Sequence, residues 1–117
     1  ENLLQALESR LDNVVYRMGI AKTRTQARQF VGHKHILVNG DIVNIPSFQV
    51  RPGDEVEVRE RSKSMDPIQE AIAGSNNDFA WIQFDTKVMK GKLLELPARE
   101  DIPENINEQL IVELYSK

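Results

Sequence analysis

Four arginines in the first quarter of the chain are the residues whose type and spacing suggest chemistry. Arg10 and Arg17 are seven positions apart, and Arg24 and Arg28 are four apart, so on helices the members of each pair would share one side. A guanidinium group carries a permanent positive charge and a planar fork of N–H donors that fits the oxygens of a phosphate. The spacing therefore predicts a surface for the sugar-phosphate backbone of a folded RNA.

Other groups suited to a phosphate backbone occur near these arginines. The candidates that the pattern suggests are Arg10, Arg17, Lys22, Arg24, Arg28, Lys34, Asn39 and Arg51. A-form RNA has a deep, narrow major groove, so proteins recognise its helices through backbone shape, phosphates and 2′-hydroxyls. The aromatic residues of this chain fall mostly at apolar positions, which disfavours stacking on single-stranded bases. The pattern thus favours a helix or a junction as the target.

Two helices are expected to hold the arginines. Apolar residues at three- and four-residue steps predict an amphipathic helix over about residues 2–18, followed by Gly19 as a C-terminal cap. Thr23 and Gln26 form a capping-box pattern at the start of a second helix, which Gly32 is expected to end. The same pattern places Arg10 and Arg17 on the solvent-facing side of the first helix.

A small sheet is expected to follow. Asn39-Gly40 between β-branched residues predicts a hairpin over residues 36–43, because both central positions of its turn need positive φ. Residues 51–54, Arg-Pro-Gly-Asp, have the composition of a type II turn, and residues 55–59 alternate as a half-buried strand. The fold class predicted is α+β, with two short helices packed on a small, mostly antiparallel sheet.

The second half of the chain is expected to add to that sheet. Residues 81–84 and 92–96 are predicted as paired strands with a turn at Lys90-Gly91, and residues 68–73 as one or two helical turns. A last helix is predicted from Asn107 to Tyr115. We expect one domain over residues 1–117, with a core at 8–65 and an extension at 66–117.

The charge is unevenly distributed. The whole chain has a net charge of −3, which by itself argues against a nucleic-acid ligand. Residues 1–40, however, hold six Lys and Arg against three Asp and Glu, whereas residues 66–117 hold five against ten. This segregation predicts a basic face on an acidic body.

Several other classes of function lack their residues. The chain has no cysteine, which excludes disulfides and thiolate metal sites, and no apolar run near the about 20 residues that cross a bilayer. We find no hydrolase triad, phosphate-binding glycine loop or zinc-protease motif. His33 and His35 lack evident partners for a metal, and we expect them to contact solvent or phosphate. No enzyme activity, cofactor, metal, membrane or small-molecule substrate is expected.

The run from Ser9 to Glu60 resembles the αL RNA-binding motif, and the whole chain is similar to about the last three-fifths of the bacterial small-subunit ribosomal protein S-four family, including its ending at residues 106–117. The resemblance implies a cytoplasmic ribosomal protein that binds a helix junction in the 5′ domain of 16S rRNA and nucleates assembly of the subunit body. It further implies that the protein lies next to ribosomal proteins S-five and S-twelve and influences translational accuracy. It also implies that the N-terminal region of the family is missing. Matching positions carry an RNA-facing role onto Arg10, Arg17, Arg24, Arg28, His33, Asn39 and Gly40, with Asp12 orienting an arginine.

Two other interpretations stay open at the level of sequence. One is an αL module appended to an RNA-modifying or tRNA-charging enzyme, which would keep its catalytic residues in another domain. The other is a protein-interaction module that carries basic residues, which the negative net charge favours. Both would preserve the arginine pattern without a ribosomal role.

Overall fold

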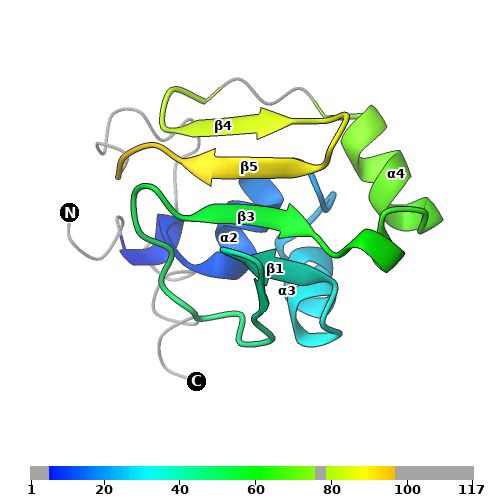
Figure 1. Cartoon of the computed structure of the whole chain (residues 1–117), viewed down its shortest axis with the longest axis horizontal. Coiled ribbons are helices and arrows are strands. Elements are labelled where there is room, and N and C mark those ends of the chain that lie inside the picture. The colour runs from blue at the N-terminus through cyan, green and yellow to red at the C-terminus, as the bar shows by residue number, and fades with distance from the viewer. Residues whose placement is uncertain (1–5, 76–78, 97–117) are drawn as a thin grey trace.

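A five-stranded antiparallel sheet is the centre of the fold. The structure is a computed structural model and describes residues 6–75 and 79–96. Among these the strand order is β2-β1-β3-β5-β4, and each neighbouring pair is antiparallel (Figure 1). The strands are β1 (Ile36–Val38), β2 (Asp41–Ile42), β3 (Glu55–Val58), β4 (Ile82–Asp85) and β5 (Lys90–Leu93). The expected α+β class is confirmed.

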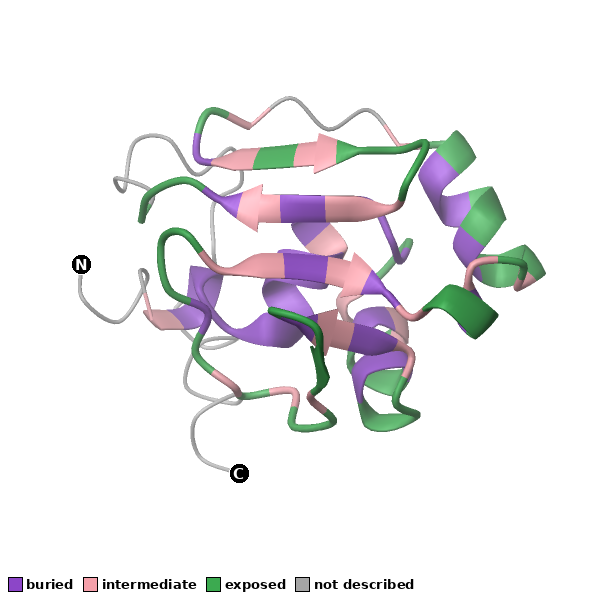
Figure 2. Cartoon of the chain, viewed as in Figure 1, coloured by how far each residue is buried: buried purple, intermediate pink, exposed green. Residues whose placement is uncertain are grey.

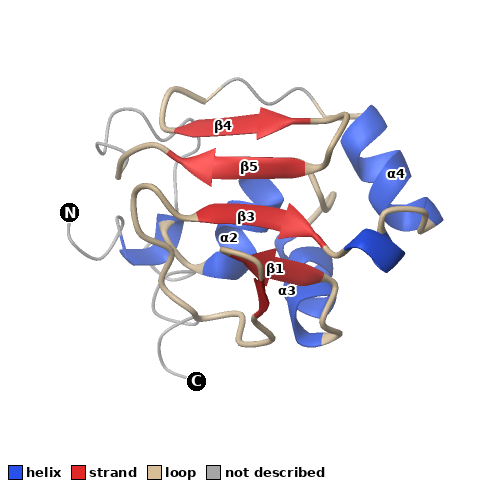
Figure 3. Cartoon of the chain, viewed as in Figure 1, coloured by secondary structure: helices blue, strands red, loops and turns tan. Residues whose placement is uncertain are grey.

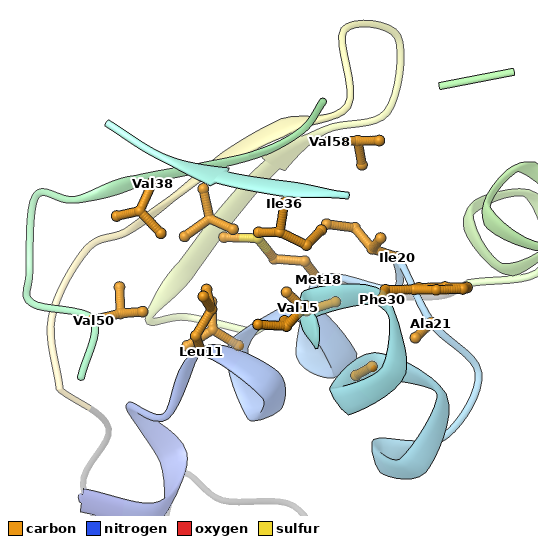
Figure 4. Close-up of a cluster of buried hydrophobic side chains, with 14 of the residues drawn as sticks. Leu11, Val15, Met18, Ile20, Ala21, Phe30, Ile36, Val38, Val50 and Val58 are labelled. Atoms are coloured by element: carbon orange, nitrogen blue, oxygen red, sulfur yellow. The ribbon is translucent and has the colours of Figure 1, made fainter. Parts of the chain in front are cut away.

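Two helices cover one face of this sheet. Figure 3 shows α2 (Leu11–Arg17) and α3 (Arg24–Gly32) behind the strands, and α4 (Asp66–Ala73) at one end, after a short 3-10 helix at Glu60–Ser62. Leu11 and Val15 of α2, and Met18 at its C-cap, point toward the strands (Figure 4), and all three are completely buried. The alternating burial of β3 and β5 leaves the charged residues of these strands on the opposite, open face (Figure 2).

The chain is not one continuous helix up to residue 18. A helical turn at residues 6–8 ends, and Arg10 takes an extended conformation with φ −63° and ψ 142° as the N-cap of α2. Here the backbone pairs with a distant loop, because Leu11 N–H donates to Phe48 O at 2.8 Å and Val50 N–H donates to Ser9 O at 2.8 Å. The expectation of a single helix was wrong because these tertiary hydrogen bonds replace helical ones.

The cap of α3 forms nearly as expected. Thr23 Oγ1 accepts a hydrogen bond from Gln26 N–H at 3.0 Å, while Gln26 Oε1 accepts one from Lys22 N–H at 2.7 Å. The helix ends at Gly32. Lys34 then takes a φ of +66°, and the N–H groups of Lys34 and His35 donate to Val31 O and Phe30 O, as in a Schellman motif. A lysine thus occupies a left-handed position that glycine favours.

The two turns expected at Asn39-Gly40 and at residues 51–54 are confirmed. Asn39 and Gly40 have φ of +52° and +87° at the tip of the β1–β2 hairpin, and Gly53 has a φ of +95° in the turn before β3. Asn39 joins the two turns, because its Nδ2 donates to Asp54 Oδ1 at 3.1 Å and its Oδ1 accepts from Glu55 N–H at 2.9 Å.

The predicted turn at Lys90-Gly91 was wrong. Both residues lie inside β5, and the chain turns at residues 86–89, where Met89 has a φ of +54°. Gly91 is needed for packing rather than for a turn, since a Cβ atom there would lie 2.5 Å from Gln83 O and 2.8 Å from Met18 Cε. The helix predicted from Asn107 lies outside the described residues.

Candidate nucleic-acid interface

Arg17 is buried and paired inside the protein. Its Nε and Nη2 donate to the two carboxylate oxygens of Glu8 at 3.0 and 3.2 Å, and the two side chains are only 2% and 0% exposed. The guanidinium carbon also lies 5.4 Å from the centre of the Phe79 ring. The expectation that Arg17 faces solvent was wrong, because α2 packs this side of itself against the turn at residues 6–8. In this structure Arg17 balances a buried carboxylate.

Arg10 has the same role for Asp12. Its Nε and Nη2 donate to Asp12 Oδ1 and Oδ2 at 3.1 and 3.2 Å, in a fork-to-fork pair. The whole residues are 8% and 5% exposed. The expected solvent-facing position of Arg10 was therefore also wrong, and its side chain is held by the carboxylate of the following helix.

Arg28 remains accessible on α3. Its side chain is 46% exposed, and its Nε lies 3.8 Å from Asp12 Oδ2. Asp12 thus lies between a buried arginine and an exposed one, and the expectation that it orients an arginine agrees with this geometry. Because Arg10 already balances the charge of Asp12, Arg28 adds positive charge at the surface.

Arg24 is half-buried beside α2. Its Nε donates to Asn13 Oδ1 at 2.8 Å, and its guanidinium carbon lies 4.6 Å from the centre of the Tyr16 ring. Lys22, just before the helix, is exposed, with its Nζ 3.8 Å from Glu70 Oε2 of α4. Lys22, Arg24 and Arg28 therefore give the first half of α3 a concentration of cations, to which we refer as the α3 basic face.

The other candidates lie around the end of α3 and on the turns. His33 and Lys34 are exposed where α3 ends. Burial, followed by the nearby His33 and Arg59, lowers the pKa of the His35 imidazole from its usual value. Its Nδ1 forms a hydrogen bond of 2.8 Å with Ser62 Oγ, so His35 connects β1 to the 3-10 helix rather than adding charge.

Asn39, Gly40 and Arg51 form a separate group. All three are exposed, and the Asn39–Asp54 bond links the hairpin tip to the turn that begins at Arg51. Residues of β1 separate this group from the end of α3 along the chain. The four arginines thus do not form one surface. Arg10 and Arg17 are internal, and Arg24 and Arg28 lie on α3.

Glu8, Asn13 and Tyr16 contact the arginines in ways that sequence reasoning missed. Asn13 was visible only as a polar residue of the first helix, and its burial (2% exposed) follows from the break at Arg10. Glu8 and Arg17 are nine residues apart, a separation at which no single helix brings side chains together. Only the tertiary packing of residues 6–8 on α2 makes this pair.

Two kinds of feature, a metal-binding cluster and a membrane-spanning helix, are not found among the described residues. No group of three or more His, Asp or Glu side chains that could hold a metal ion occurs within residues 6–75 and 79–96. Over the same residues, no helix has the length and apolar character needed to cross a membrane. One groove of about 630 Å³ lies on the open face of the sheet and is lined by residues of both charges such as Glu55, Asp85 and Lys92.

Replacing Lys34 by glycine should stabilise the protein, because Lys34 has a φ of +66°. A left-handed conformation costs an L-residue about 1–2 kcal/mol, and glycine removes this cost. Glycine also gives the unfolded chain more conformational freedom, which offsets part of the benefit, so we expect the free energy of unfolding to rise by about 0.5–1 kcal/mol. Urea unfolding measures the gain in the free energy of unfolding. Lys34→Ala is the control, since it removes the charge and keeps the strain. Equal stability of the Gly and Ala variants would contradict the assigned strain.

Comparison with known proteins identifies a family model and several relatives that this chain resembles. The S4 domain family matches residues 9–56. Over its whole length the chain is 63% identical to the small ribosomal subunit protein uS4 of Parabacteroides distasonis, 59% identical to that of Cytophaga hutchinsonii and 60% identical to that of Bacteroides fragilis. The chain spans 59% of the length of each of these relatives. The expected resemblance to the small-subunit protein S-four is confirmed.

Proposed function

Because the chain contains an S4 domain and is similar over its whole length to uS4 proteins of the small ribosomal subunit, we propose that it is a structural, non-enzymatic rRNA-binding protein of that subunit. The observation that supports this proposal most directly is the charge balance of the first half of the fold. Residues 6–40 contain six Lys and Arg against two Asp and Glu, a net charge of +4, although the whole chain carries −3.

The two buried ion pairs explain how that charge reaches the surface. Glu8 and Asp12, the acidic residues of this region, are each matched by an internal arginine. The remaining cations lie on or beside α3, at Lys22, Arg24, Arg28 and Lys34. A backbone of phosphates would meet this surface without competition from solvent-facing carboxylates of the same segment.

The finer proposal follows the resemblance. The protein binds a helix junction in the 5′ domain of 16S rRNA, nucleates assembly of the subunit body, lies next to ribosomal proteins S-five and S-twelve, and influences translational accuracy in the cytoplasm. The candidate RNA contacts in the present structure are Lys22, Arg24, Arg28, His33, Lys34, Asn39, Gly40 and Arg51. Arg10 and Arg17 contribute as internal counter-ions that shape this surface.

The paired substitution Arg24→Ala and Arg28→Ala tests the proposed surface. Each lost charge-assisted contact is worth about 1 kcal/mol, so the affinity for a 5′-domain rRNA fragment should fall about thirtyfold. The slope of log K against log salt should become shallower by about 1.5, since each phosphate contact adds roughly 0.7–0.9. Filter binding or fluorescence titration at several salt concentrations measures both quantities.

A matched control removes two cations from the other side of the sheet. Lys87 is exposed on the β4–β5 turn, and Lys92 lies on the open face of β5. Replacing both by alanine changes the net charge by the same amount and should affect the slope much less. If the control pair and the α3 pair weaken binding equally, long-range charge rather than the α3 basic face accounts for the affinity, and the proposed surface is wrong.

A further inference from the structure

Asn39 extends the hydrogen bonding between β1 and β3 with its side chain. Its backbone N–H donates to Glu55 O at 2.8 Å, and its Oδ1 accepts a hydrogen bond from Glu55 N–H at 2.9 Å. In an antiparallel pair a backbone carbonyl normally accepts this second bond. Here the chain turns toward β2, with a φ of +52° at Asn39, and the side-chain amide oxygen accepts the bond instead. Asparagine suits this position because it tolerates the left-handed conformation and carries the acceptor.

Asp54 connects this hairpin tip to the next turn of the chain. Its Oδ1 accepts a hydrogen bond from Asn39 Nδ2 at 3.1 Å, and its Oδ2 accepts one from the backbone N–H of Arg51 at 2.9 Å. On the other side of the turn, Gly53 N–H donates to Leu93 O at 2.7 Å, and Leu93 N–H donates to Asp54 O at 3.2 Å. The turn is thus held between the β1–β2 hairpin and the end of β5.

The hydrogen bonds give Asn39 and Arg51 different roles at this edge. Asn39 uses its backbone N–H, its amide oxygen and one hydrogen of its amide nitrogen inside the protein. Arg51 is fixed through its backbone N–H, and its side chain is exposed. A guanidinium group offers five N–H donors to phosphate oxygens, and an arginine whose backbone is already ordered loses less entropy when a ligand binds. Asn39 is therefore suited to support, and Arg51 to contact.

We infer that Asn39 and Asp54 are positioning residues that fix Arg51 beside the hairpin tip for contact with an RNA phosphate. This inference rests on the proposed function and changes the role of Asn39 within it from a direct contact to a support. It also explains why a carboxylate lies at an edge that binds phosphate, where a negative charge by itself would weaken binding. The carboxylate of Asp54 is needed there because it accepts hydrogen bonds from both turns.

A double-mutant cycle between Asn39 and Arg51 tests the inference. Asn39→Gly removes both side-chain hydrogen bonds, keeps the net charge and suits the positive φ of the turn. It should weaken binding to the 5′-domain rRNA fragment about fivefold, the effect of one ordinary hydrogen bond. Arg51→Ala should weaken binding at least as much and make the salt slope shallower by roughly 0.7–0.9. In the Arg51→Ala background, Asn39→Gly should have no further effect, because the group through which it acts is gone.

An exchange of the two side chains separates support from direct contact. In the variant Asn39→Asp with Asp54→Asn, the carboxylate at position 39 can accept from Glu55 N–H and from the amide at position 54, whose oxygen can accept from Arg51 N–H. The net charge is unchanged, so the affinity should stay within about twofold of the original, whereas Asn39→Asp alone places two carboxylates together and should lose about fivefold or more. If Asn39 contacted phosphate directly, the exchanged variant would stay weak, and the inference would be wrong.

The outcomes separate the positioning role from the proposed function. If Arg51→Ala and Asn39→Gly bind like the original protein while the paired substitution on α3 weakens binding, the positioning role is wrong and the α3 basic face stands. If none of these variants weakens binding, both are wrong. An equal effect of Asn39→Gly with and without Arg51 would show that Asn39 does not act through this arginine, which also overturns the inference.

Hydrogen exchange in the free protein tests the same inference without RNA. The backbone N–H of Arg51 donates to Asp54 Oδ2, and in Asn39→Gly this carboxylate loses its partner on the hairpin. The exchange rate of the Arg51 N–H should therefore rise about two- to fivefold. Asn44→Gly is the matched control, since Asn44 is exposed just after β2, and it should leave this rate unchanged. An unchanged rate in Asn39→Gly, or an equal rise in the control, would overturn the inference.

Discussion

Replacing Glu8 by alanine is expected to lower the free energy of unfolding by about 3–5 kcal/mol, the usual range when one partner of a buried ion pair is removed. The carboxylate is 0% exposed and accepts both hydrogen bonds of the Arg17 fork, at 3.0 and 3.2 Å. Without Glu8, the Arg17 charge stays in the interior but loses the carboxylate that balances it. A loss of this size is a large part of the whole free energy of unfolding of an ordinary domain, so the variant would be close to unfolding.

Urea unfolding followed by circular dichroism measures this loss. Glu60→Ala is a matched control, because Glu60 also pairs with a cation, Lys63, at 3.6 Å but is 89% exposed, and exposed pairs contribute about 0–1 kcal/mol. The combined variant Glu8→Leu with Arg17→Met should be more stable than Glu8→Ala, since it removes both buried charges. Similar losses for Glu8→Ala and Glu60→Ala would contradict the assigned burial.

Replacing Gly91 by alanine is expected to cost about 3 kcal/mol, at the upper end of the usual range for overpacking. The added Cβ would lie 2.5 Å from Gln83 O, 2.8 Å from Met18 Cε and 2.9 Å from Phe84 Cδ1. The methionine end is flexible and can move away. The carbonyl of Gln83 belongs to the neighbouring strand β4, so relief of this contact requires the two strands to separate.

Gly74→Ala is the control for this second variant. Its Cβ would meet only Glu70 O at 3.5 Å, an ordinary contact, and its φ of −90° suits any residue. Alanine there should be neutral or slightly stabilising through the unfolded chain. Thermal unfolding of both variants is a sufficient measurement. If Gly91→Ala unfolds at the same temperature as Gly74→Ala, the close approach of β5 to β4 is wrong.

Local signals allowed correct prediction of much of the fold from sequence. Thr23 at a cap, Asn39-Gly40 at a hairpin and Gly53 in a type II turn each depend on φ or on a hydrogen bond within four residues. Such features are encoded by the residues at the site itself. For this reason the α+β class, the order of the first helices and strands, and the positions of these turns agree with the structure.

The errors arose where distant segments determine the outcome. Ser9 and Arg10 leave the helical conformation because residues 46–50 pair with their backbone. That break rotates Arg10 and Arg17 toward internal carboxylates, so a helical wheel drawn through residues 2–18 placed them incorrectly. Gly91 resembled a turn residue by composition, yet its role depends on a methionine more than seventy positions earlier.

The candidate site shows the same division. Arg24 and Arg28 lie together on α3 because their four-residue spacing falls within one real helix. The contacts of Asn13 and Tyr16 with Arg24 follow from the packing of α2 on α3, which no local pattern encodes. A sequence with abundant arginines therefore indicates the kind of ligand well, but not which arginines reach it.

The position of β5 in the sheet has a consequence for any shortened form of this protein. The S4 family match ends at residue 56, inside β3, while β5 pairs with β3 through Glu55, Val56 and Glu57. A chain that stopped before β5 would leave the N–H and C=O groups of β3 open on one side, together with its buried valines. Unprotected strands of this kind recruit other chains into aggregates. We therefore expect the β4–β5 hairpin to prevent such association by covering β3. The edge strand is then β4, whose exposed residues Gln83 and Asp85 are polar.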